Sequence, residues 1–330
     1  MRAPGPAAAL VLLSAAAAAA GPETSQREFA SSQIKKGVRA LGMGGDGATV
    51  GNYALVWKDE GTAVADAGVT AFSDTGNRFQ FTAVGFSTPK LPGDIGVFVV
   101  AMSEWGSGIR VHLKSPAFAA GAGFEGEGSD EAVFVKLARP LGNGFSLGAL
   151  VGYEHSVFTA TANGGAGTVN YGTGYRPSGG AGLTWEAGKL LLAGVRVLTS
   201  QDLETRTDSL GAASGLLSSW EVRGGAAVRP LPWLLLDLGY AGLARRSGLD
   251  RSSSFESSLV AGAELALLDD HLWLRGGWNE TSPTAGLSVR GGPLKLDLAY
   301  VQDLGVSRTR ELFGQSGSSV IATLSYDYAR

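Results

Sequence analysis

The sequence predicts an all-β protein, a transmembrane antiparallel β-barrel of about fourteen strands with an N-terminal glycine-rich plug segment. Three observations lead to this prediction. Apolar side chains alternate with polar or small ones in segments of roughly ten residues. Short and long connections alternate between these segments, as in outer-membrane barrels. Glycine accounts for 50 of the 330 residues, while hydrophobic residues make up 44% and charged residues 17%, so the chain is too apolar to be disordered.

Composition also argues against several classes of function. The 27 basic and 30 acidic residues leave a net charge of −3, so no positive field favours nucleic acid as a partner. There is no cysteine and only three histidines, which removes thiolate chemistry and most zinc sites. Two G-x-G-x-x-G matches, at 42–47 and 121–126, are expected by chance in so glycine-rich a chain. We therefore expect no cofactor and no metal site.

Residues 1–20 are predicted to be a secretory signal peptide. Arg2 gives a positive start, an apolar run covers 7–20, and three small alanines end at Ala20, where we expect cleavage. The run is shorter than the roughly 20 residues of a spanning helix. The expected location is the outer membrane of a Gram-negative bacterium.

Residues 21–60 precede the alternating segments and are predicted to be a plug. Glycines stand among small residues there, so the stretch has no core of its own and should fold against a structure that is already built. The interior of the barrel is the expected place.

Residues 61–330 are predicted to form the barrel. Between 145 and 154, Phe145, Leu147 and Val151 share one face of a strand, and Gly152 and Glu154 lie on the other. The same alternation recurs at 234–240, 259–267, 294–300 and 320–328.

The second face of these strands carries isolated charges of both signs among glycine, serine and alanine. That pattern favours an enclosed polar lumen with lipid outside, over a water-soluble sandwich or a lipocalin-like barrel. Two interpretations of the lumen charges stay open, a selectivity lining or ion pairs that fill the barrel and fix the plug. The charges are Lys136, Glu154, Glu186, Arg196, Arg223, Asp237, Glu264, Arg275, Arg290, Lys295, Asp297 and Asp327.

The spacing of the connections predicts the strand count. Counting back from the C-terminus gives thirteen segments, and a strand from Thr62 to Phe72 makes the total even. The short connections fall at 89–94, 140–143, 187–189, 230–233, 268–271 and 291–293, and longer ones at 105–129, 159–177, 200–217, 246–254 and 305–318, with a brief one at 280–283.

The stretch 37–48 reads GVRALGMGGDGA and is followed by DEGTAV at 59–64. It resembles the N-terminal signature of FadL-like outer-membrane proteins and of the related PorV-type barrels. The motif residues are Arg39, Leu41, Gly42, Met43, Gly44 and Gly45. Where that signature continues as Asn-Pro-Ala-Gly, this chain has Ala65-Asp66-Ala67-Gly68. The resemblance implies passage of hydrophobic compounds through a plugged barrel or, in the PorV-like branch, a partner role in protein secretion.

The function expected is therefore non-enzymatic passage of hydrophobic, fatty-acid-like molecules across the outer membrane. A scaffold or binding barrel in a secretion complex is the alternative. An outer-membrane hydrolase is not favoured, because His155 and Ser156 are neighbours on a strand and so point to opposite faces.

An apolar stretch in the longest predicted loop is the candidate contact surface. Besides outer-membrane lipid, the partners expected are a hydrophobic small molecule or a secretion protein docked on this loop, and an inward fold over the lumen is the alternative. Its residues are Trp105, Ile109, Leu113, Phe118 and Phe124.

Overall fold

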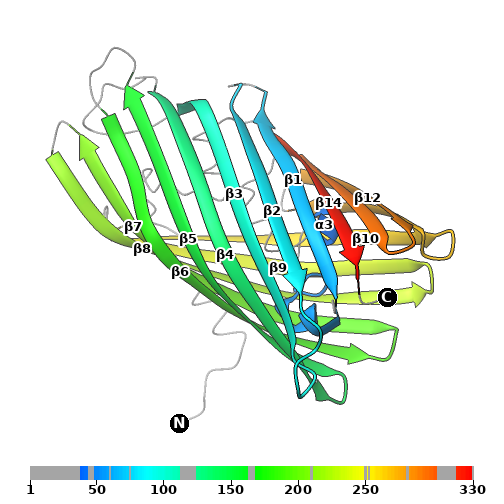
Figure 1. Ribbon diagram of the computed structural model, residues 1–330. Helices are drawn as coiled ribbons and strands as arrows, with labels where there is room; N and C mark the ends of the chain where they lie inside the picture. Colours follow the sequence, from blue (N-terminus) through cyan, green and yellow to red (C-terminus); the bar gives the residue numbers. More distant parts are fainter. Residues whose placement is uncertain are drawn as a thin grey trace, which may run out of the picture.

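Fourteen antiparallel strands form a closed barrel in the described part of the chain (Figure 1). The computed structural model describes residues 38–43, 48–58, 61–73, 76–111, 124–162, 168–208, 211–248, 251, 253–279, 282–302 and 317–328. Within these residues two short helices precede the strands, α3 (Val38–Gly42) and the 3₁₀ helix η2 (Tyr53–Lys58). No helix among the described residues is long and apolar enough to cross a membrane.

The strands follow the chain in order around the barrel. They are β1 (Thr62–Phe72), β2 (Arg78–Ser87), β3 (Gly96–Val111), β4 (Phe124–Gly142), β5 (Phe145–Ala162), β6 (Thr168–Ala187), β7 (Leu191–Asp208), β8 (Gly211–Leu231), β9 (Leu234–Ser247), β10 (Ser253–Leu267), β11 (Leu272–Asn279), β12 (Ser282–Gly291), β13 (Leu294–Gln302) and β14 (Gly317–Asp327).

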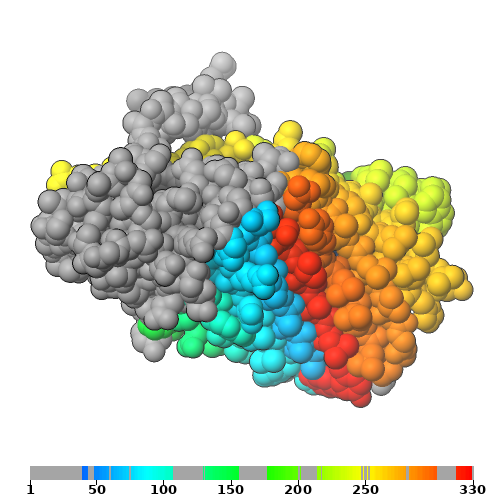
Figure 2. All heavy atoms as spheres, turned by 90° about the horizontal axis from the view of Figure 1, so that it is seen from above, coloured from blue at the N-terminus to red at the C-terminus, as the bar shows by residue number. Residues whose placement is uncertain are grey.

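The barrel closes where β1 pairs with β14. The register runs from Thr62 opposite Asp327 to Phe72 opposite Gly317. Figure 2 shows the two ends of the strand series side by side, with β1 in blue next to β14 in red. The predicted first strand, from Thr62 to Phe72, is confirmed with the same bounds, and the predicted total of fourteen strands is confirmed as well.

The outer face of the wall is apolar, as the alternation predicts, whereas the inner face combines the predicted charges with an apolar cluster on β2 to β5, β13 and β14. On β5, Val151 is 64% exposed on the outer face, while its neighbour Leu150 is 1% exposed inside. On β9, Leu238 is 61% exposed and Asp237 is 6% exposed. Many of the predicted lumen charges are buried within the barrel, namely Glu154, Arg196, Arg223, Asp237, Glu264, Arg275 and Asp297.

Short turns gather at one end of the barrel, called here the short-turn end. Between β4 and β5 the turn consists of Asn143 and Gly144, with φ of 51° and 82°. Positive φ at both positions is the geometry of a type I′ turn, which Asn-Gly favours.

The predicted long loops were wrong in extent, because the strands continue well into them. β3 reaches Val111 and β4 begins at Phe124, so most of the predicted loop 105–129 is paired strand. Likewise β7 and β8 pair from Leu191 to Asp208 across the predicted loop 200–217, and β5 and β6 run to Ala162 and from Thr168 across 159–177. Backbone pairing continues past the point where apolar alternation ends, since the ladder satisfies N–H and C=O groups whatever the side chains are.

Candidate functional site

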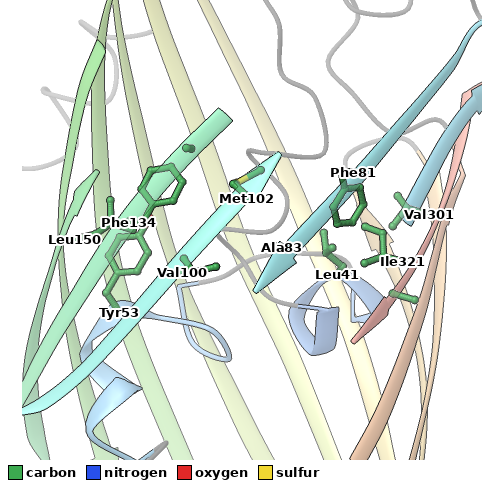
Figure 3. Close-up of a cluster of buried hydrophobic side chains, with 12 residues drawn as sticks. Leu41, Tyr53, Phe81, Ala83, Val100, Met102, Phe134, Leu150, Val301 and Ile321 are labelled. Carbon is green, nitrogen blue, oxygen red and sulfur yellow. The ribbon is translucent and has the colours of Figure 1, made fainter. Parts of the chain in front are cut away.

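The described part of the predicted plug lies against the inner face of the wall. This inner segment comprises residues 38–43 and 48–58. Helix α3 contacts β11 to β14, whereas η2 contacts β3 to β6 on a different part of the wall. Figure 3 shows both contacts, with Leu41 near Phe81 and Ile321, and Tyr53 near Phe134 and Leu150.

Arg39 of α3 binds a carboxylate of the wall. Its Nε donates to Glu264 Oε2 over 2.8 Å, and its Nη2 donates to Glu264 Oε1. Two parallel bonds of this kind fix the orientation of the guanidinium as well as its position. Loss of water around it lowers the pKa of Arg39, but the Glu264 carboxylate, with help from Asp297 and Asp237, outweighs that effect and raises the pKa above its ordinary value.

The rest of the motif packs close to the wall. A Cβ on Gly42 would lie 3.0 Å from Gly286 Cα of β12, so the two backbones touch only because both residues are glycine. Thr284 Oγ1 donates to the carbonyl of Gly42 over 3.2 Å. Met43 is 1% exposed. The described motif residues therefore seat α3 on the wall.

Residues 48–58 are fixed by side-chain hydrogen bonds to several strands. Thr49 Oγ1 donates to Asp237 Oδ1 over 2.8 Å, Asn52 Nδ2 donates to the Val195 carbonyl over 3.2 Å, Trp57 Nε1 donates to Ser146 Oγ over 3.1 Å, and Lys58 pairs with Glu186. These bonds reach β5, β6, β7 and β9, so the segment is held on more than one side.

Glycines of the wall make the space that the inner segment occupies. At seven positions a Cβ would lie between 2.0 and 3.1 Å from an atom of the inner segment, closer than or at the tight end of real contacts. We call these positions the glycine bed: Gly96, Gly148, Gly180, Gly182, Gly194, Gly262 and Gly286.

Charges in the lumen are paired across strands. Glu221 Oε1 accepts from Arg196 Nη2 over 2.9 Å and from Arg223 Nε over 2.7 Å. The Arg196 guanidinium lies 5.3 Å from the centre of the Tyr53 ring, so the same group also supports η2. These contacts favour the second interpretation of the lumen charges, in which ion pairs fill the barrel and hold the segment.

A cavity of about 690 Å³ lies between the inner segment and the wall. Phe98, Val100, Met102 and Phe134 give it an apolar side. It reaches the short-turn end, where its lining includes the turn residues 188–190. Basic side chains are more numerous than acidic ones at that end; they include Lys58, Lys189, Arg229, Arg290 and Lys295.

The other predicted site residues are not brought together as a loop. Trp105 lies in β3, opposite Ser129 of β4, and is 42% exposed. Ile109 and Phe124 also lie in paired strands rather than in a loop, which corrects the prediction. Leu113, Phe118, Gly44 and Gly45 lie outside the described residues.

Sequence reasoning missed the wall partners of the inner segment. The alternation placed Glu264 inside, but nothing in the sequence pairs it with Arg39, 225 residues away. The glycine bed was detectable in the sequence, because glycines recur on the polar face of the predicted strands. Their recurrence does not reveal which atoms occupy the space beside them.

Comparison with known proteins gives matches in structure alone. No protein-family model and no curated protein matches the sequence. The Pseudomonas putida toluene transporter TodX matches with a TM-score of 0.58 at 10% identity, over 88% of this chain and 97% of its own. A Pseudomonas aeruginosa FadL homologue gives 0.53 at 12% identity, over 88% and 95%. The monoaromatic hydrocarbon channel CymD gives 0.51 at 13% identity, over 87% and 95%.

The chain has the fold of the FadL-like channels. The family likeness predicted from the motif around Arg39 is thereby confirmed at the level of fold. In this FadL-like barrel the motif seats α3 on β11 to β14, and the cavity lies beside it.

Proposed function

We propose that the protein is a non-enzymatic outer-membrane channel for hydrophobic small molecules, with residues 21–60 as its plug and residues 1–20 as a signal peptide removed on export. The cavity between the inner segment and the wall is the observation that carries the proposal. Its volume of about 690 Å³ is in the range of small-molecule sites, and its apolar side suits a hydrophobic compound. The FadL-like fold supports the same function, since solved structures with this fold include a toluene transporter and hydrocarbon channels.

A bulky side chain inside the cavity tests the proposal. Met102 is 5% exposed and lines the cavity, so Met102→Trp fills part of the apolar space. Ala101 precedes it on β3 and is exposed on the outer face, so Ala101→Trp is a matched control that introduces the same side chain outside the cavity. We expect Met102→Trp to reduce entry of a fluorescent hydrophobic probe into cells several-fold, and Ala101→Trp to leave it unchanged.

Folding is checked for both variants by their heat-dependent mobility in electrophoresis. A folded Met102→Trp variant that admits the probe at the rate of the native chain would contradict passage through this cavity. Native mass spectrometry of the protein in mild detergent addresses the alternative. A stoichiometric apolar ligand supports the channel, whereas a stoichiometric protein partner without ligand would favour the secretion scaffold.

A further inference from the structure

The cavity reaches the surface among the turns of the short-turn end. Its lining there includes residues 188–190 and Pro293, and Leu190 is 62% exposed although it lines the cavity. A smaller cavity of about 290 Å³ shares lining residues with it and extends to Pro232 and Asp270 in the next two turns. The mouth of the cavity therefore lies among the turns β6–β7, β8–β9 and β10–β11.

The wall beside the apolar side of the cavity is continuous. Phe98, Val100 and Met102 of β3 pair with β2 on one side and with β4 on the other without a register shift. The shift that β3 does have lies at 106–109, beyond the cavity lining. The described part of the wall therefore has no lateral opening next to these residues, and the mouth is where the cavity meets the surroundings of the short-turn end.

Each of the three turns at the mouth exposes one large apolar side chain. We call Leu190, Trp233 and Leu268 the apolar rim; they are 62%, 49% and 72% exposed. The turns belong to neighbouring hairpins, and backbone hydrogen bonds fix them to the next strand. Arg229 N donates to the Leu190 carbonyl over 2.7 Å, and Ala266 N donates to the Trp233 carbonyl over 2.8 Å. The rim is thus a connected surface rather than three separate flexible tips.

Leu268 has a backbone conformation that leucine seldom adopts. Its φ is 52°, and Asp269 and Asp270 follow with 51° and 63°. The turn is closed by His271 N, which donates to the carbonyls of Leu267 and Leu268 over 3.3 and 3.1 Å. Asparagine or glycine fits this conformation better, and an exposed leucine adds nothing to the core. Strain that a fold retains often serves a functional surface, so Leu268 points to a contact outside the chain.

Charged side chains flank the apolar rim. Lys189 and Arg229 are exposed on one side, and Asp269 and Asp270 are exposed beside Leu268 on the other. An apolar centre with a charged edge is the composition of a protein interface, in which tryptophan is a frequent anchor. The two aspartates disfavour an anionic lipid surface, because like charges repel. A protein with complementary charges fits the rim better.

We propose that the apolar rim docks a soluble periplasmic protein, which receives the hydrophobic compound at the mouth of the cavity. The inference rests on the proposed function. In outer-membrane barrels the short turns lie on the periplasmic side. A hydrophobic compound that leaves the mouth would expose its apolar area to water, which is unfavourable unless a second apolar surface takes it over. The partner has an apolar patch with acidic side chains opposite the two cations of the rim and basic ones opposite the two aspartates.

Photochemical crosslinking in the cells that make the protein tests the contact. p-Benzoylphenylalanine replaces Trp233 in one variant and Leu91 in the control. Leu91 is a 47% exposed leucine in the β2–β3 turn at the same end, and it lines neither cavity. We expect the Trp233 position alone to give an adduct with one soluble protein. Adducts with phospholipid or with a second copy of the chain, or no adduct, would overturn the proposal.

The captured protein must also have the properties of an acceptor. After purification it should retain the fluorescent hydrophobic probe and bind the native barrel in mild detergent. Failure of either measurement would overturn the proposal, because the crosslink would then report a chance encounter.

The double variant Trp233→Asn/Leu268→Asn removes two apolar side chains of the rim. Asparagine tolerates the left-handed conformation, so Leu268→Asn alone should unfold at the same or a higher temperature than the native protein. In the double variant we expect the captured protein to bind at least about tenfold more weakly. Entry of the probe into cells should fall several-fold, while the purified variant retains the probe as the native protein does. Leu91→Asn is the matched control and should leave all three measurements unchanged.

The outcomes separate the docking surface from the channel. Native binding and native probe entry in the double variant would overturn docking, and the channel would stand if Met102→Trp still blocks entry. Loss of probe retention by the purified double variant would also overturn docking, because the effect would then lie in the cavity. Probe entry through Met102→Trp at the native rate, together with loss of the captured partner in the double variant, would support the contact and contradict only the route.

Discussion

Gly194 shows at the level of one residue why the wall is rich in glycine. A Cβ there would lie 2.0 Å from the carbonyl oxygen of Ala48, which is itself fully buried. Glycine usually weakens a strand, so its recurrence on the inner face needs a compensating gain. Close contact with the inner segment supplies that gain.

A single added methyl group should therefore loosen the inner segment. Gly194→Ala forces Ala48 away and should destabilise the folded protein by about 1–3 kcal/mol, as overpacking does. Gly224→Ala is the control, because a Cβ at Gly224 meets no atom closer than 4.0 Å. We expect a lower heat-unfolding temperature and faster proteolysis of the N-terminal region in Gly194→Ala alone. Identical unfolding of the two variants would show that the glycine bed is not tightly filled.

The sequence predicts which residues point into the barrel better than it predicts the groups that they contact. Period-two alternation is a local property, so it placed Asp237 and Glu264 inside the barrel correctly. The bonds they accept from Thr49 and Arg39 depend on where the inner segment lies in three dimensions. Local periodicity contains no information on that placement.

At the scale of elements, β1 is the strand whose prediction depended on the total number of strands in the barrel. Its segment has the weak alternation of Ala-rich sequence, and it was assigned because an even number of strands was needed. The structure gives it both neighbours, β14 and β2. In contrast, the strand ends at 105–129 were predicted badly, since outward side chains beyond the apolar band need not be apolar.

The pairing of β1 with β14 can be tested by a disulfide across the seam. Val69 lies opposite Val320, and both are exposed on the outer face, at 42% and 54%. Opposite Cα atoms of an antiparallel pair lie within the span of a disulfide. The native chain has no cysteine, so Val69→Cys/Val320→Cys should form an intramolecular bond on oxidation.

The control moves one cysteine along β14. Leu324 lies opposite Ala65, four residues from Val69 along β1, or roughly 13 Å away. Val69→Cys/Leu324→Cys should stay reduced, as mass measurement after thiol alkylation would show. Efficient oxidation of this second pair would mean that the seam has a different register or is open.

For the whole molecule, the outer surface decides between a membrane barrel and a soluble one. Large apolar side chains are exposed around the wall, among them Val84 at 62%, Leu238 at 61% and Leu259 at 67%. A protein that exposed an apolar surface of this kind to water would tend to aggregate. Inside the barrel, in contrast, ion pairs and the inner segment lie beside the apolar cluster around Phe81 and Phe134. The fold thus exposes apolar side chains on its outside and keeps its buried charges inside, the arrangement expected in lipid.

An arginine substitution on this outer surface tests whether the surface lies in hydrocarbon. Leu238 lies four residues into β9 from Leu234, near the middle of the 9–11 residues that a strand needs to cross the hydrocarbon. Leu238→Arg should therefore destabilise the folded protein in bilayers by about 2–4 kcal/mol. Leu268 is 72% exposed but lies in the turn after β10. Leu268→Arg should therefore destabilise the folded protein in bilayers by no more than about 1 kcal/mol. Equilibrium folding into lipid vesicles from urea provides both values. Because the two substitutions add the same charge to exposed leucines, only the depth of the site in hydrocarbon can separate them, and equal values would contradict the membrane assignment itself.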